Sequence, residues 1–292
     1  MTIRSIILST MLVSFNLLAG SAFAESSVWK VSKDNNYFYI GGTIHLLSEQ
    51  DHPLPAEFDL AYNDAGKIFF ETDLAATETP EFQSKFIAAM TYSDDRTLEG
   101  ELEPAIYRKL ENFMTSRQMP IAQFSKFQPW GVSLMIVILE YQRLGMMPNY
   151  GVDAYFNGRA LSDHKRIMGL ETADEQLNFL KSMAGMDPNA GIEYTLRDLK
   201  RLPESMAAMK ESWRSGDLDA LAESAFMLQM QEEFPQIYNT IVTNRNNAWM
   251  AQLVRLTEDS AKEFVLVGAM HLYGKEGILN QLALQGFTVE QL

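Results

Sequence analysis

Two of the four histidines in this chain share one local context. His45 closes the sequence GTIH, His271 closes GAMH, and a leucine follows each histidine. Each GxxH comes directly after a short apolar run of the kind that forms a buried strand. At the usual glycine frequency of about 7%, two or more of four histidines would have a glycine three residues earlier by chance only about 3% of the time. Glycine at a strand end lets the backbone approach a ligand closely, so the pair indicates two imidazoles aimed at one ion or one substrate atom.

The alternative to a functional role is a structural one, in which each histidine only forms hydrogen bonds within the fold. The shared context of His45 and His271 favours the functional interpretation. The other two histidines lack that context: His52 precedes a proline in a polar loop, and His164 lies in the sequence SDHK. We expect both of these to be surface residues.

Two glutamates occupy matching positions in the chain. Glu71 and Glu171 each end a short apolar run, where burial of a charge is costly unless the charge has a partner. A metal ion or a substrate ammonium would be such a partner. The alternative is a salt bridge to an arginine that faces the core, for which Arg245 is the candidate.

The order of the elements predicts an α/β fold. Strands are expected at both ends of the chain and helices in its middle. The strands are expected at 28–32, 37–40, 67–72, 166–171, 264–267 and 288–292, and the helices at 56–63, 80–90, 104–117, 128–143, 152–161, 173–183, 191–213, 218–226, 235–256 and 274–285. We expect a single domain, with a small mixed sheet formed by the N- and C-terminal segments and a large helical insertion.

This arrangement suggests where the histidines lie. In open α/β sheets, ligands bind beyond the carboxyl ends of the strands. We therefore expect the strands that end near His45 and His271 to be neighbours. The methionines of the helical part, such as Met227 and Met230, fit ordinary core packing better than an adaptable apolar cleft.

Composition excludes several classes of function. The chain has 292 residues, a formal charge of −14 and no cysteine, so disulfides and thiolate chemistry are absent. It contains no basic run, and an acidic protein of this kind is a poor ligand for nucleic acid or for anionic lipid. We expect a peptide or a small molecule as the substrate, with no nucleic-acid partner.

Residues 1–24 have the composition of a secretory signal peptide. Arg4 supplies the positive charge, an apolar stretch runs to Leu18, and Ala22-Phe23-Ala24 supplies a cleavage site. An uncleaved membrane anchor would need about 20 continuous apolar residues, which this segment lacks. We expect cleavage before Glu25, no membrane contact afterwards, and a periplasmic or secreted location.

The chain also resembles a known family. The sequences GGTIHLL, FFETDL, GVDAYF, GLET, NRNNAW and VGAMHLYGKEGIL follow one another in the order typical of the TraB/GumN family, and the resemblance spans residues 25–292. That family is related to the Tiki metalloproteases and to the erythromycin-esterase/ChaN-like group. The resemblance implies one α/β domain in which His45, His271 and Glu71 share a site. It also implies substrate-binding roles for a polar pair, Arg245 and Asn246, and for Asp153 of the GVDAYF segment.

Three functions are compatible with these residues. The first is a divalent-metal-dependent hydrolase, most simply a peptidase. Its zinc, manganese or cobalt ion would be held by His45, His271 and Glu71, with Glu71 or Glu171 as third ligand or general base. The second is metal-free hydrolysis, in which one histidine activates water and a carboxylate orients it. The third is a non-catalytic protein that binds haem, a metal or a peptide in the same cleft.

Overall fold

The structure is a computed structural model, and it describes residues 25–292. The predicted signal peptide, residues 1–24, lies outside this range. Six strands form one sheet in the order β4-β3-β5-β2-β1-β6. Their bounds are β1 Val28–Lys33, β2 Asn36–Thr43, β3 Lys67–Thr72, β4 Arg166–Glu171, β5 Glu263–Gly268 and β6 Thr288–Gln291.

Four of these strands are parallel. β4 pairs with β3, β3 with β5, and β5 with β2, all in the parallel sense, whereas β1 and β6 extend the sheet in antiparallel pairings. The predicted mixed sheet and α/β class are therefore confirmed. The expectation that the strands before the two GxxH motifs are neighbours is also confirmed, because Thr43 of β2 lies opposite Gly268 of β5.

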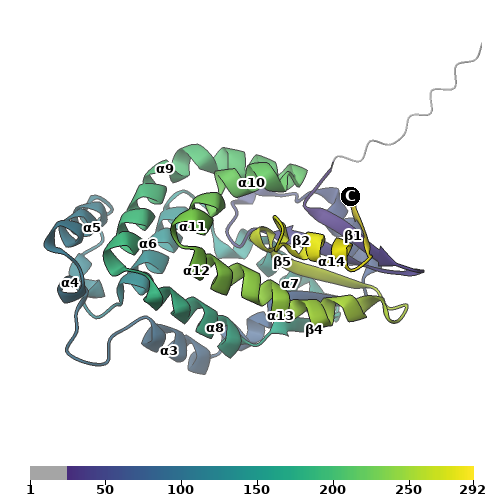
Figure 1. Cartoon of the computed structure of the whole chain (residues 1–292), viewed down its shortest axis with the longest axis horizontal. Coiled ribbons are helices and arrows are strands. Elements are labelled where there is room, and N and C mark those ends of the chain that lie inside the picture. Colours follow the sequence, from purple (N-terminus) through teal and green to yellow (C-terminus); the bar gives the residue numbers. More distant parts are fainter. Residues whose placement is uncertain (1–24) are drawn as a thin grey trace, which may run out of the picture.

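The helical part differs in one respect from the prediction of a single insertion. Because β4 joins the sheet from the middle of the chain, the helices come in two segments, one before β4 and one after it. α1 (Ala56–Asp64) lies between β2 and β3. The helices between β3 and β4 are α2 Leu74–Thr77, α3 Pro80–Ala89, α4 Leu98–Glu101, α5 Pro104–Ser116, α6 Pro129–Arg143 and α7 Val152–Ser162. Those after β4 are α8 Ala173–Lys181, α9 Pro188–Ser215, α10 Leu218–Ser224, α11 Met227–Glu233, α12 Pro235–Tyr238, α13 Asn244–Leu253 and α14 Ile278–Leu284. Figure 1 shows the sheet at one end of the molecule and α4, α5, α6 and α9 extending away from it.

The sheet is buried on both faces, as parallel sheets usually are. Alternate residues of β5 enter different clusters: Phe264 and Leu266 pack with α1, α7 and the end of α9, whereas Val265 and Val267 pack with α13 and α14. A third cluster fills the helical part between α4, α5, α6 and α9. No helix within residues 25–292 is both long enough and apolar enough to cross a membrane.

Close contacts hold β2 in place beside β5. A Cβ at Gly41 would lie 2.9 Å from side-chain atoms of Phe264 and Leu266, so only glycine allows this approach. The buried Trp213 of α9 donates its indole N–H to the Gly42 carbonyl at 2.7 Å. The strand that carries the first GxxH is thus fixed from the sheet and from the helical part.

Two local expectations were wrong. The helix predicted over 235–256 is interrupted, because Asn239–Thr243 form a π-helical turn (η5) directly before α13. His52 is half-buried rather than on the surface, since its Nε2 bonds the Tyr150 carbonyl at 2.9 Å and its ring packs against Tyr155. His164 is exposed, as predicted.

Candidate functional site

The chemically active side chains gather at the carboxyl edge of the four parallel strands. Glu71 lies near the end of β3 and Glu171 ends β4, while His45 and His271 lie in the turns that follow β2 and β5. Register brings them close: Thr72 pairs with Glu171, and Thr43 with Gly268. Residues far apart in the sequence therefore meet at one edge of the sheet, the edge at which ligands bind in open α/β sheets.

Arg245 of α13 lies at the centre of this group. Its Nη2 donates to Glu71 Oε2 and, at 2.6 Å, to Glu171 Oε1, and its Nε donates to Glu171 Oε2 at 3.0 Å. Its Nη1 lies 3.1 Å from His271 Nε2 and also donates to the Ile241 carbonyl of the π-helical turn. One guanidinium thus holds both strand-end glutamates and one histidine, which confirms the salt-bridge alternative for the two glutamates.

The charges of this cluster control each other's protonation. Burial alone would raise the pKa of Glu71, but the positive charge of Arg245, with a smaller contribution from His45, holds it well below its usual range. Burial raises the pKa of Glu171, against the hydrogen bond from Arg245. Burial would lower the pKa of Arg245, but the two carboxylates raise it. Glu71 is therefore ionised at neutral pH.

His271 is a neutral imidazole whose tautomer is fixed. Asn246 donates its Nδ2 to two backbone carbonyls, so its Oδ1 faces His271 Nδ1, 2.6 Å away, and accepts the proton on that nitrogen. The lone pair of Nε2 then accepts from Arg245, which can only donate. Burial is the main reason that the pKa of His271 falls to about 4, and the neighbouring positive charges of Arg245 and His45 add to it.

His45 has a different environment. Its side chain is 63% exposed, and its Nδ1 donates to Asp153 Oδ2 at 2.7 Å, while Thr43 donates to the other Asp153 oxygen at 3.0 Å. The charge of the Asp153 carboxylate raises the pKa of His45 to about 9. The two GxxH motifs therefore place one imidazole with a raised pKa and one with a lowered pKa at the same edge of the sheet.

The GVDAYF segment explains how Asp153 reaches His45. A Cβ at Gly151 would lie 2.2 Å from the His45 carbonyl oxygen, so glycine is required where α7 approaches this turn. The backbone N–H of Val152 donates to the Ile44 carbonyl at 3.1 Å. These contacts place Asp153, in the first turn of α7, beside the imidazole.

A small space above Gly268 connects the two histidines and Glu71. The point that a Cβ would occupy at this glycine lies 3.1 Å from Glu71 Oε1 and 3.7 Å from both His45 Nε2 and His271 Cδ2. Glu71 Oε1 also accepts the Gly268 N–H at 2.7 Å. The two imidazoles are thus nearer to each other than the roughly 12 Å beyond which we expect joint binding of one ion to be excluded.

The structure adds one residue that sequence reasoning missed. Trp249 donates its indole N–H to Glu171 Oε2 at 3.2 Å, and its ring lies 4.6 Å from the His271 ring, centroid to centroid. It follows Arg245 by four residues on α13, so both side chains leave the same face of the helix. That spacing within NRNNAW was the signal that could have identified it.

All seven predicted site residues lie in one connected group. Glu71, Glu171 and His271 are bonded directly to Arg245, and Asn246 is bonded to His271. The bonded pair His45 and Asp153 lies beside them, because His45 Nε2 faces Glu71 across the point above Gly268. Asn246 is fully buried behind His271, and Asp153 is 8% exposed, so each of these two orients a histidine. The seven residues are His45, Glu71, Asp153, Glu171, Arg245, Asn246 and His271.

We predict that Arg245→Met lowers the free energy of unfolding by about 3–5 kcal/mol near pH 7, because it leaves buried carboxylates without a partner. In the unchanged protein, the lowered pKa of Glu71 gives stability that is present above its unfolded pKa and is lost as the pH falls. In the variant, burial raises the pKa of Glu71, so stability increases as the pH falls. The difference between the two proteins should therefore shrink towards about pH 4, as urea unfolding can measure.

Lys85→Met is the matched control. Lys85 pairs with Asp174 on the surface, with side chains 58% and 63% exposed, so its loss should cost less than about 1 kcal/mol. Equal stability of Arg245→Met and the unchanged protein near pH 7 would contradict the central role of this arginine.

Comparison with known proteins gives a family. A chain from Escherichia coli K12 and one from Shigella flexneri, both called uncharacterized protein YbaP, are each 25% identical to this chain over 265 residues, which cover 91% of it and 94% of each relative. No solved structure matches significantly. The family model described as TraB/PrgY/gumN matches residues 27–291, as the motifs around the two histidines predicted. The chain therefore belongs to the TraB/PrgY/gumN family.

Proposed function

We propose that this chain is a hydrolase that cleaves an acyl bond of a peptide or another small-molecule substrate. Water attacks the acyl carbon, the bond from that carbon to the amine or alcohol breaks, and the proton taken from water passes to this leaving group. One observation carries the proposal: His45 Nε2 and Glu71 Oε1 face the same space above Gly268. A water molecule there would have an imidazole nitrogen on one side and an ionised carboxylate on the other. This is the arrangement that general-base hydrolysis requires.

His45 is our candidate for the base. Its Nδ1 is bonded to Asp153, which fixes the ring and stabilises the imidazolium that forms when Nε2 takes a proton from water. Its exposed side chain also allows a substrate to approach. Glu71 would orient the water through Oε1, since its own low pKa makes it a weak base.

The remaining polar residues support this role. Arg245 keeps Glu71 ionised and fixes its direction together with the Gly268 N–H. His271 stays neutral beside Glu71, with 3.7 Å between its Nε2 and Glu71 Oε1. A preorganised set of this kind needs little rearrangement as charge develops in the reaction.

A metal-dependent hydrolase, most simply a peptidase, is the second candidate. The His45–Asp153 bond favours it, because metal-binding imidazoles usually donate their second N–H to a carboxylate. Zinc, manganese or cobalt would be held by His45, His271 and Glu71. These residues do not fit the ion as they stand, because Arg245 already bonds His271 Nε2 and Glu71 Oε2.

We predict that His45→Gln and Gly268→Ala each reduce kcat/KM by roughly 10²–10⁴-fold. The first removes the base. The second adds a methyl group to the space for water, at a residue whose φ of −50° and ψ of 131° suit alanine. Initial rates on a peptide library and on a panel of small acyl esters, with metal content and melting temperature measured for each protein, test this.

The control is His164→Asn, which removes an exposed imidazole at a φ of 55° that asparagine tolerates. It should leave the rates unchanged. Retention of full turnover by His45→Gln would reject the proposed base. Turnover that depends on a bound ion, lost together with that ion in His45→Gln, would favour the metal-dependent candidate. An absence of turnover on every substrate would favour a non-catalytic binding protein.

The pH dependence distinguishes the two possible roles of His45. A general base must be neutral, so kcat/KM should rise with pH until the pKa of His45, about 9, is passed. Asp153→Asn removes the charge that raises this pKa, so the rising limb should move to lower pH and the plateau should fall. A rate that decreases with pH through this range would instead make His45 a general acid.

We also propose that the chain is exported and that residues 1–24 are removed, on the strength of the Ala22-Phe23-Ala24 site. The mature protein should begin at Glu25 and carry a formal charge of −15, because Arg4 is lost from the total of −14. Intact-mass measurement of the protein from the periplasmic fraction checks both points. A full-length chain in the membrane fraction would contradict cleavage.

A further inference from the structure

A second site is present in the helical part. A cavity of about 460 Å³ lies between α6, α9, the turn η4 (Ser182–Gly185) and the helices α11 and α12. Its volume is in the range of small-molecule sites. No residue of the candidate hydrolytic site is among the described residues that line it.

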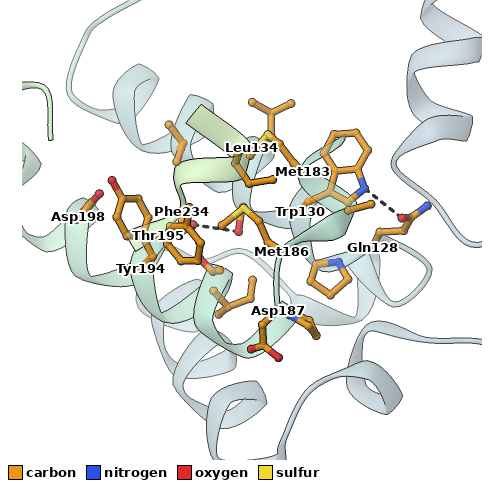
Figure 2. A pocket seen from close by; sticks show the side chains of 18 of the residues that line it. Gln128, Trp130, Leu134, Met183, Met186, Asp187, Tyr194, Thr195, Asp198 and Phe234 are labelled. Carbon is orange, nitrogen blue, oxygen red and sulfur yellow. Dashed lines mark hydrogen bonds between the residues drawn. The ribbon is translucent and has the colours of Figure 1, made fainter. Parts of the chain in front are cut away.

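The lining is mostly apolar and aromatic. Figure 2 shows Met183, Met186, Trp130, Tyr194 and Phe234 around the space. Met230 also lines the cavity, whereas Met227 is buried in the core. Some methionines of the helical part therefore line an apolar cavity, and others pack in the core. Flexible thioethers beside aromatic rings make an adaptable wall for an apolar molecule.

Asp198 of α9 is an acidic side chain of this lining. Its side chain is 15% exposed, and its Oδ1 is enclosed by the protein and has no hydrogen-bond partner. Arg197 Nε lies 3.6 Å from Oδ1, too far for a hydrogen bond, and the same guanidinium donates to Glu233. Burial raises the pKa of Asp198, so its neighbours do not fully compensate the carboxylate.

Three polar side chains around the cavity, Thr195, Tyr194 and Trp130, have hydrogen-bond partners within the protein. Thr195 donates to the Gly191 carbonyl, and it lies 3.0 Å from Ser133 Oγ. The Tyr194 hydroxyl donates to the Phe226 carbonyl at 3.2 Å. The Trp130 indole donates to Gln128 at 3.1 Å (Figure 2). The accessible part of the Asp198 carboxylate is therefore left to meet a donor on a ligand.

We propose that this cavity binds a small apolar molecule that carries one amine. The ammonium would pair with the accessible part of the Asp198 carboxylate, and the apolar body would lie among the methionines and aromatic rings. Tyr194 and the other rings of the wall also attract a cation through their faces. A purely apolar ligand would leave the buried carboxylate unpaired, and an anionic ligand would be repelled by it.

Isothermal titration calorimetry of the whole chain with three matched probes tests this proposal. The probes are 4-phenylbutylamine, 4-phenylbutan-1-ol and 4-phenylbutanoate, which share one apolar body and differ in charge. The amine should bind at least about tenfold more tightly than the alcohol, and the carboxylate more weakly still. Asp198→Asn should remove the preference for the amine.

Two further variants complete the design. Glu193→Gln removes one charge from the exposed face of α9, where Glu193 pairs with Lys109, and should leave probe binding unchanged. Leu134→Trp fills the cavity and should weaken binding of all three probes. Melting temperatures of each variant confirm the fold, and the titration does not depend on turnover at the hydrolytic site.

Two results would overturn the proposal. One is no amine binding to the unchanged protein. The other is equal amine binding by the unchanged protein and by folded Asp198→Asn, since the carboxylate would then have no part in recognition.

Discussion

The buried guanidinium of Arg245 is the constraint on which the site depends. It compensates two carboxylates that end neighbouring strands, and without it each would carry the cost of an unpaired buried charge. Because the guanidinium is planar and presents its donors in a fixed fork, it also sets the direction of both carboxylates and of the His271 lone pair. The π-helical turn before α13 joins this arrangement, since the Ile241 carbonyl accepts from the same side chain.

The strand order explains why residues so distant in the chain can be held this precisely. β3, β5 and β2 are adjacent and parallel, so their carboxyl ends present Glu71, His271 and His45 along one edge. Packing on both faces makes this edge rigid, because each strand is fixed by two layers of side chains. The long α9 reaches from the helical part to the sheet, where Trp213 bonds the strand that precedes His45.

Much of the site could be read from the sequence because its signals are local. A GxxH after an apolar run and a glutamate at the end of one are both local patterns at strand ends, and they located four of the side chains that meet at this edge of the sheet. The sequence also indicated Arg245 as a partner for the glutamates. It could not indicate that this one arginine bonds both glutamates and His271. The split of the helical part, the π-helical turn and the cavity near Asp198 depend on tertiary packing, which no short window of residues records.

The two histidines show how one motif can supply two kinds of chemistry. His45 is exposed and bonded to an anion, so its charged form is stabilised, whereas His271 is buried beside a cation, so its neutral form is favoured. The difference comes from their partners: Asp153 from α7 for the first, Asn246 and Arg245 from α13 for the second. Environments that push the pKa values of paired groups apart are a common basis for assigning separate roles in acid–base chemistry. In this site the imidazole with the higher pKa is also the exposed one, whereas the imidazole with the lower pKa is buried within the charge cluster around Arg245.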